Sequence, residues 1–204
     1  MRPDKWHFGA VEDEGAGESR RAKLKAAIRL EPLRHSPHCP GLSGLFSIVN
    51  AIRLALADKH VFSERQLADM ISAELRFLDG RLTAERVLTC GLPTGLWLRL
   101  AEAMAYGTSR VTGSPLSVER EHVLDVSRPN VWLGIERVIE ARRPLLGLFC
   151  GGRYTVLSGF TQSSLLLFDS GGAHWISRTS TGVPTDREAA KHVLCPASFI
   201  SLRS

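Results

Sequence analysis

The spacing of apolar residues changes near Leu145, and this change constrains the fold more than any other feature of the chain. Before it, apolar residues recur every three or four positions, as they do on one face of a helix. After it, short apolar runs are separated by turn residues, which is typical of strands. Helices followed by strands predict an α+β fold, in which a helical half packs on an antiparallel sheet.

Four helices are predicted ahead of the strands, from residues that typically start or end a helix. The first begins at Ser43, whose hydroxyl is suited to cap a helix. The second follows Ser63, because Ser63 and Gln66 form a capping-box pattern. Two more are expected over residues 94–106 and 130–142. The predicted apolar faces are Leu45, Ile48, Val49, Ile52 and Leu56 in the first helix, and Leu67, Met70, Ile71, Leu75 and Leu78 in the second.

Strands are predicted at one early position and then throughout the C-terminal part. A loop over residues 35–42 leads into the first helix, and residues 161–164 are typical of a hairpin loop. The predicted strands are residues 26–33, 114–126, 145–149, 154–160, 165–168, 173–178 and 199–202.

The composition is that of a single globular domain. The chain has 204 residues, 44% of them apolar, which is enough for one sizeable core. Residues 1–24 contain an acidic, Gly-rich stretch and are expected to be a flexible N-terminal segment, with the domain over residues 25–204. No run of about 18 apolar residues occurs, so no membrane span is expected.

The cysteines and the net charge indicate in which compartment the chain works and which classes of partner it binds. The four cysteines are scattered without a Cys-x-x-Cys pair, and no secretory signal is visible, which favours a cytoplasmic chain with reduced thiols. No histidine or cysteine spacing indicates a metal, and no cofactor motif occurs. The net charge of +5 is dispersed and no nucleic-acid motif appears, which argues against nucleic-acid binding. A basic binder of nucleic acid or of an acidic partner is kept as one alternative.

Short motifs far apart in the chain carry the chemical argument. Residues 43–46 read Ser-Gly-Leu-Phe, residues 152–159 read Gly-Arg-Tyr-Thr-Val-Leu-Ser-Gly, and residues 166–170 read Leu-Leu-Phe-Asp-Ser. With a cysteine at position 43 and a histidine at position 153, these motifs would match a nucleophile helix and a strand that carries the general base. The chain thus resembles the papain-like, C39-type cysteine peptidases over about residues 32–202. The resemblance implies a papain-like α+β fold.

The same resemblance shows what this chain lacks. It places Ser43 at the nucleophile, Arg153 at the general base and Asp169 at the acid that orients the base. A guanidinium keeps its proton at any useful pH, so it cannot act as a base. In the peptidases a glutamine shortly before the cysteine helps to form the oxyanion hole, whereas here Pro37 precedes Ser43 by six residues. The resemblance therefore implies a catalytically degenerate domain, and an Arg153–Asp169 ion pair can lock the remnant site.

Ordinary structural roles compete with this interpretation. Ser43 can serve as a helix cap, Asp169 as a turn residue and Arg153 as a solvated strand end.

A rearranged active site is a further alternative. Cys39 lies four residues before Ser43, next to His38, and His174 follows Asp169 closely. A thiol beside an imidazole is the arrangement of a cysteine hydrolase, so Cys39 with His38 or His174 is the alternative catalytic set.

The resemblance implies a binding role for the degenerate domain. Degenerate relatives of C39 peptidases hold peptide segments without cutting them, and pseudoenzymes often pair with an active partner. The predicted function is therefore a peptide- or protein-binding module, with an active peptidase or a transporter among the implied partners.

Overall fold

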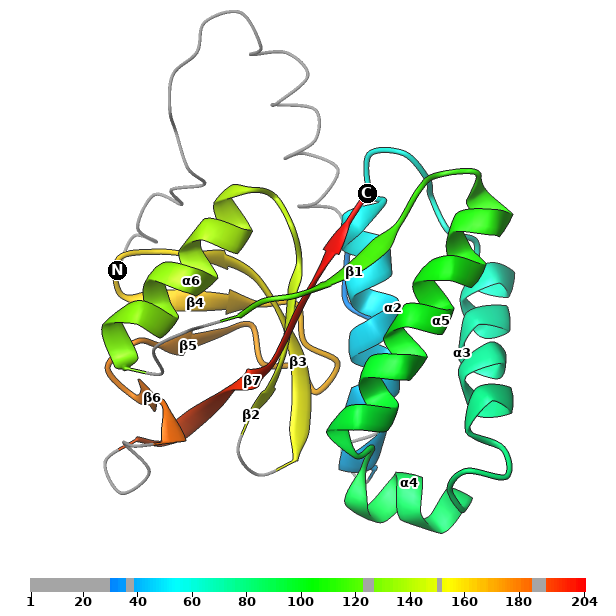
Figure 1. The fold of residues 1–204 in the computed structure, drawn as a ribbon, viewed down its shortest axis with the longest axis horizontal. Helices are drawn as coiled ribbons and strands as arrows, with labels where there is room; N and C mark the ends of the chain where they lie inside the picture. Colours follow the sequence, from blue (N-terminus) through cyan, green and yellow to red (C-terminus); the bar gives the residue numbers. More distant parts are fainter. Residues whose placement is uncertain (1–29, 36–38, 123–126, 150–151, 185–189) are drawn as a thin grey trace, which may run out of the picture.

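A helical half and a sheet half lie side by side in the molecule (Figure 1). The computed structural model describes residues 30–35, 39–122, 127–149, 152–184 and 190–204. Helices dominate the first part of the chain and antiparallel strands the second, which confirms the predicted α+β class. The segment predicted to be flexible, residues 1–24, lies entirely outside the described residues.

The helical elements follow the predicted order, with two additions, the single 3₁₀ turn η1 and the short helix α4. The capping box is confirmed: the Ser63 hydroxyl accepts from the Gln66 amide at 3.3 Å, and the Gln66 side chain accepts from the Ser63 amide at 2.9 Å. The third predicted helix continues past Gly107, because the left-handed residue that ends it is Gly113 (φ 69°). The elements are η1 (Pro40–Leu42), α2 (Ser43–Ala55), α3 (Glu64–Leu78), α4 (Ala84–Cys90), α5 (Thr94–Thr112) and α6 (Arg128–Glu140).

The strands form one antiparallel path in the order β1-β7-β2-β3-β4-β5, and β6 pairs in parallel with β7. The predicted strand over residues 145–149 is confirmed at both ends, and the other predicted strands from residue 114 onward overlap observed strands. The hairpin of β2 and β3 pairs Leu145 with Leu157 and Phe149 with Arg153. The strands are β1 (Ser117–Arg120), β2 (Leu145–Phe149), β3 (Arg153–Phe160), β4 (Ser164–Leu167), β5 (Trp175–Ser177), β6 (Thr181–Gly182) and β7 (His192–Arg203).

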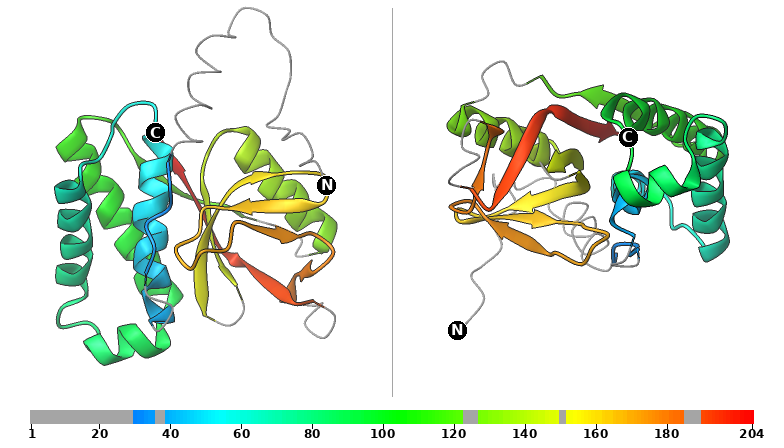
Figure 2. Two further views of the ribbon diagram at one scale, coloured as in Figure 1. Left: turned by 180° about the vertical axis from the view of Figure 1, so that it is seen from behind. Right: turned by 90° about the horizontal axis from the view of Figure 1, so that it is seen from below.

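Two apolar cores cover the two faces of the sheet. Successive residues of a strand point to opposite faces. Accordingly Leu146 and Val156 join the core of α2, α3 and α5, whereas their neighbours Leu145 and Leu157 join the core beneath α6. Figure 2 shows α6 on one side of the strands and α2 with α5 on the other. The site positions at the start of α2 and the start of β3 meet at the first of these cores.

The predicted early strand over residues 26–33 is wrong where it can be judged. Residues 26–29 lie outside the described residues, and residues 30–33 are not part of the sheet. The reason is that a side chain takes the place of a neighbouring strand. Leu33 exchanges both of its backbone hydrogen bonds with the amide of Asn50, and Pro32 has no N–H to donate.

The apolar face of α3 differs from the prediction at one position. Leu75 was expected to be buried and is 51% exposed. Its neighbour Glu74 is 0% exposed and lies in line with the buried Met70 and Leu78, one helical turn away on each side. The helix therefore buries a carboxyl group where the sequence pattern offered a leucine.

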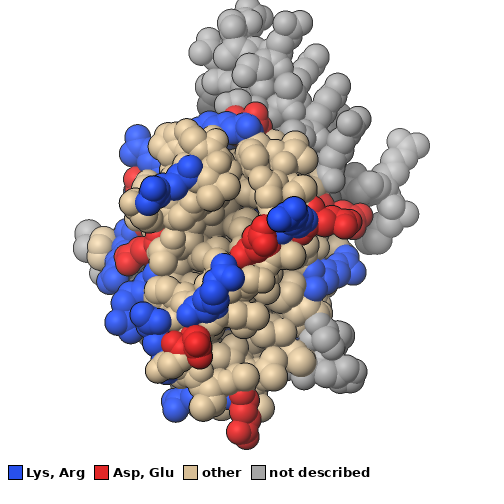
Figure 3. Space-filling model, turned by 90° about the vertical axis from the view of Figure 1, so that its right-hand side faces the viewer, with Lys and Arg blue, Asp and Glu red and all other residues tan. Residues whose placement is uncertain are grey.

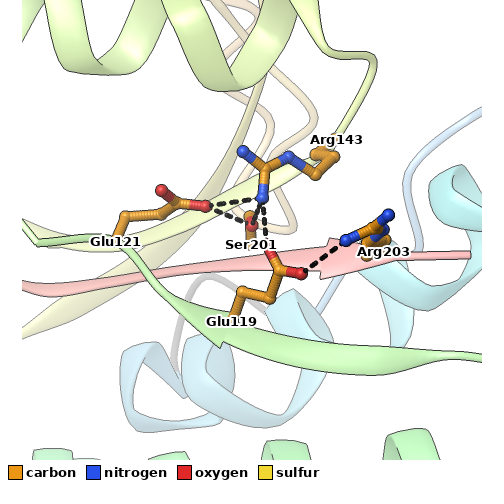
Figure 4. Close-up of polar contacts among 5 residues, drawn as sticks. All are labelled: Glu119, Glu121, Arg143, Ser201 and Arg203. Atoms are coloured by element: carbon orange, nitrogen blue, oxygen red, sulfur yellow. Dashed lines mark hydrogen bonds and ion pairs between the residues drawn. The ribbon is translucent and has the colours of Figure 1, made fainter.

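A polar network ties the edge strand β1 to the body of the sheet (Figure 4). Arg143 forms ion pairs with Glu119 and, at 3.1 Å, with Glu121. It also donates to the Ser201 hydroxyl of β7 at 3.2 Å, and Arg203 lies 3.4 Å from Glu119. These contacts join β1, β7 and the turn before β2, so we interpret the network as structural.

The helical face has a mixed charge. Figure 3 shows basic and acidic side chains occurring together over this face. Within the described ranges, no helix is both long and apolar enough to cross a membrane.

Candidate functional site

Ser43 lies at the start of α2 with its hydroxyl turned toward the sheet. Its Oγ accepts a hydrogen bond from the backbone N–H of Tyr154 at 3.2 Å, and the residue is only 1% exposed. The expectation that this hydroxyl caps the helix is wrong, because Leu42 is the N-cap residue and no side chain caps the helix start. The hydroxyl is engaged by β3 instead of by the first turn of its own helix.

Aromatic packing holds the start of α2 against β3. Trp97 of α5 donates its indole N–H to the carbonyl of Gly44 at 3.0 Å and stacks on Tyr154 with ring centroids 4.3 Å apart. The Tyr154 hydroxyl donates to the carbonyl of Leu92 at 2.8 Å. A Cβ on Gly44 would lie 3.2 Å from the side chains of both Leu92 and Tyr154. Glycine after Ser43 thus permits the close approach of helix and strand.

Asp169 is the centre of the polar part of the site. The residue is 1% exposed, and both carboxylate oxygens are occupied. Oδ1 accepts from the Thr155 hydroxyl at 2.9 Å. Oδ2 accepts from the backbone N–H of Gly171 at 2.8 Å and of Ala173 at 3.2 Å, and it pairs with the guanidinium of Arg153. Such a set of donors compensates the cost of burying a carboxylate.

Arg153 begins β3 and directs its guanidinium onto Asp169. Its side chain is 42% exposed, so the ion pair lies at the edge of the interior. A Cβ on Gly171 would lie 2.3 Å from the Arg153 Nη2, so the glycine leaves space for the guanidinium. The ion pair that the sequence suggested between these positions is present.

The structure therefore brings Ser43, Arg153 and Asp169 to one end of β3. Ser43 bonds to the amide of Tyr154, the residue next to Arg153, and Arg153 bonds to Asp169. Ser43 and Arg153 are joined through this adjacent backbone amide, and no hydrogen bond between their side chains is found within the described residues.

Burial and charge act on two other groups of this region. Burial raises the pKa of the Tyr154 phenol; its hydrogen bond with Thr94 opposes this effect, and Cys195 adds to it. The pKa of His192 at the start of β7 is lowered, first by burial and then by the positive charges of Lys191 and Arg153. His192 was not singled out from the sequence. The sequence could not show that Arg153 lies near His192, because 39 positions separate the two residues along the chain.

The alternative catalytic set is only partly described. Cys39 is half-buried and directly precedes η1, whereas His38 and Pro37 lie outside the described residues. His174 is exposed, and its carbonyl accepts from the amide of Leu167 at 2.8 Å. Within the described part of the chain, no hydrogen bond or ring contact joins Cys39 to His174.

Metal chemistry finds no support in this region. Among the residues that the structure describes, no three His, Cys, Asp or Glu side chains are grouped so that they could hold a metal ion. The groups that converge are a hydroxyl, a guanidinium and a carboxylate.

The arrangement suits a contact that holds α2 and β3 together better than it suits nucleophilic catalysis by Ser43. A hydroxyl needs its proton removed as it attacks, and a guanidinium cannot remove it. The Asp169 carboxylate is bound to that guanidinium.

Comparisons with known proteins add no family assignment. No protein-family model, no curated protein and no solved structure matches the chain.

Proposed function

We propose that the chain is a papain-like domain of the C39 type that has lost peptidase activity and binds a peptide or protein segment. One observation carries the proposal: the hydroxyl of Ser43 is buried and bonded to Tyr154, beside an Arg153 that is paired with Asp169. These residues occupy the positions that the motifs assign to nucleophile, base and orienting acid. Their convergence supports the motif assignment, and their chemistry argues against turnover.

The expected loss of activity is large. Absence of a general base typically costs about 10²–10⁴-fold in rate. A serine that is 1% exposed is also poorly placed to reach a substrate carbonyl. Both effects act on the same step, so hydrolysis through Ser43 is expected to stay at background.

The partner proposed is an extended peptide or a protein that presents one. An active peptidase or a transporter is a partner of this kind, and a cytoplasmic location fits the cysteine usage. The proposal draws support from the helices of the first core, which pack against β3 and hold the start of α2 beside it.

The two alternatives have less support. A hydrolase that uses Cys39 would need an imidazole beside the thiol, and His174 is exposed and hydrogen-bonds through its backbone elsewhere. A nucleic-acid binder would need a continuous basic surface, and the face drawn in Figure 3 carries both signs of charge.

One experiment tests binding and cleavage together. The purified chain is immobilised and exposed to a library of unstructured peptides, and the retained and released peptides are identified by mass spectrometry. The expected result is a set of retained peptides that are recovered intact. S43A and C39A chains serve as controls. Peptide fragments that vanish with S43A would refute the loss of activity, fragments that vanish with C39A would favour the alternative nucleophile, and no retained peptide would refute the binding role.

A further inference from the structure

Residues 30–35, which we call the arm, are held by a side-chain amide that acts like a neighbouring strand. Asn50 of α2 is 0% exposed, and both ends of its amide contact the same residue of the arm. Its Oδ1 accepts from the Leu33 N–H at 2.8 Å, and its Nδ2 donates to the Leu33 carbonyl at 3.0 Å. Two bonds to one residue are the pattern that an antiparallel strand provides.

Two further contacts of the arm also involve its backbone. Arg53, one helical turn after Asn50, donates to the carbonyl of Glu31 at 2.9 Å. At the other end, the N–H of His35 donates to the carbonyl of Ser170 at 3.2 Å. Backbone contacts along an extended segment are how proteins bind peptides with little dependence on sequence.

Apolar side chains add a simple pattern to this backbone recognition. Leu30 and Leu33 are half-buried against the core of the helical half. Between and after them, Glu31 and Arg34 are exposed. The arm therefore presents a Leu-x-x-Leu pattern to the helix while its charged side chains face solvent.

The arm ends beside the candidate site. His35 bonds to Ser170, the residue that follows Asp169. Its ring also lies edge-on to Phe46, one turn after Ser43 in α2, with centroids 5.8 Å apart. We call Phe46, Asn50, Arg53 and the Ser170 carbonyl the arm site.

We propose that the arm site binds an extended Leu-x-x-Leu peptide of a partner protein, and that residues 30–35 are its built-in occupant. This inference rests on the proposed binding function, because it names the chemical class of the partner. The partner peptide offers the same N–H, carbonyl and two leucines as the arm, so it replaces the arm without any new contact. Since the arm competes from within the same chain, the apparent affinity for a peptide is reduced by the fraction of chains whose arm is released.

The test uses the full chain and a fluorescent peptide with the sequence of residues 28–37 (Ile-Arg-Leu-Glu-Pro-Leu-Arg-His-Ser-Pro). The L33D chain has a weakened arm and an unaltered arm site. The L133D chain is the matched control, because Leu133 is 45% exposed on α6, which packs on the other face of the sheet. We expect the L33D chain to bind the peptide at least about tenfold more tightly than the wild-type and L133D chains, measured by fluorescence anisotropy.

A second peptide tests the role of the Asn50 amide. Methylation of the backbone nitrogen at the leucine equivalent to Leu33 removes the N–H that Asn50 accepts. This peptide should bind the L33D chain at least about tenfold more weakly. The methyl group removes the hydrogen bond to Asn50 and collides with the Oδ1 atom that the N–H approaches at 2.8 Å. Equal affinity of the three chains for the unmodified peptide, or equal affinity of the two peptides, would overturn the proposal.

Hydrogen exchange on the wild-type chain gives an answer even if the L33D chain does not fold. A large excess of the unmodified peptide should lower the protection of the Leu33 and His35 amides of the chain while α2 stays protected. Unchanged protection at both amides would overturn the proposal. If library peptides are retained but this peptide is not, the binding function stands and only the arm site is refuted.

Discussion

Replacing Glu74 with glutamine should stabilise the protein by an amount that grows with pH. Glu74 is completely buried in α3, and within the described part of the chain neither of its carboxyl oxygens has a hydrogen-bond partner. The buried residues of the neighbouring helices α2 and α5 are all uncharged. Burial therefore raises the pKa of this carboxyl well above its ordinary value of 4.5.

The sign of the pH effect follows from the direction of this shift. Below about pH 4.5 the carboxyl is protonated in both the folded and the unfolded chain, so it adds no pH dependence. Above it, the unfolded chain releases the proton while the folded chain keeps it. Stability then falls by about 1.36 kcal/mol for each pH unit, until the folded carboxyl also ionises.

Glutamine has the same shape and cannot ionise, so E74Q removes this slope and keeps a buried polar group. The difference in unfolding free energy between the E74Q and wild-type chains should therefore widen by about 1.36 kcal/mol per pH unit above pH 5. Urea unfolding followed by circular dichroism at several pH values measures it. E102Q, on the exposed side of α5, is the control and should leave the slope of the wild type. A difference in unfolding free energy between the E74Q and wild-type chains that stays constant with pH would refute the reasoning.

Two further predictions concern packing and the buried carboxylate. A Cβ on Gly41 would lie 2.0 Å from a backbone carbonyl oxygen of α4, so G41A should destabilise the fold by about 3 kcal/mol. A Cβ on Gly107 would meet open space within α5, so G107A should stabilise the fold by about 0.5–1 kcal/mol. Melting temperatures that shift in the same direction for both variants in calorimetry would contradict this. Removing the Asp169 carboxylate takes the acceptor away from the buried Thr155 hydroxyl and from three further donors, so D169A should cost about 3 kcal/mol. T155V removes one of those bonds and should cost about 1 kcal/mol. Equal losses for the two variants in urea unfolding would show that the other donors to Asp169 contribute nothing.

Features with local signals were predicted well from the sequence. The capping box at Ser63 depends on residues three apart, and it is present with both of its bonds. The strand at residues 145–149 is a continuous apolar run between turn residues, and its bounds are confirmed. The apolar face of α2 is buried at all of its predicted positions, because several core residues in register leave little choice of orientation.

Features set by distant partners were missed. The Ser43 hydroxyl bonds to an amide 111 positions away, so its local fitness as a helix cap was misleading. Residues 30–33 have strand-like composition, yet a single asparagine 17 positions beyond Leu33 replaces the sheet. Periodicity also could not decide whether Glu74 or Leu75 faces the core. Adjacent helix positions differ by about 100° in direction, so either residue can border the apolar face.

A hydrolysis assay on chains with restored catalytic residues tests the central claim most directly. Wild-type, S43C, R153H and S43C/R153H chains are compared with fluorogenic peptide and ester substrates. The account predicts background rates for the wild type and for both single variants. We expect no more than a trace of turnover, and only in the double variant. That chain alone has a thiol, an imidazole and Asp169 together, but its position 43 stays buried. Robust turnover by the wild-type chain that disappears with S43A would contradict the account.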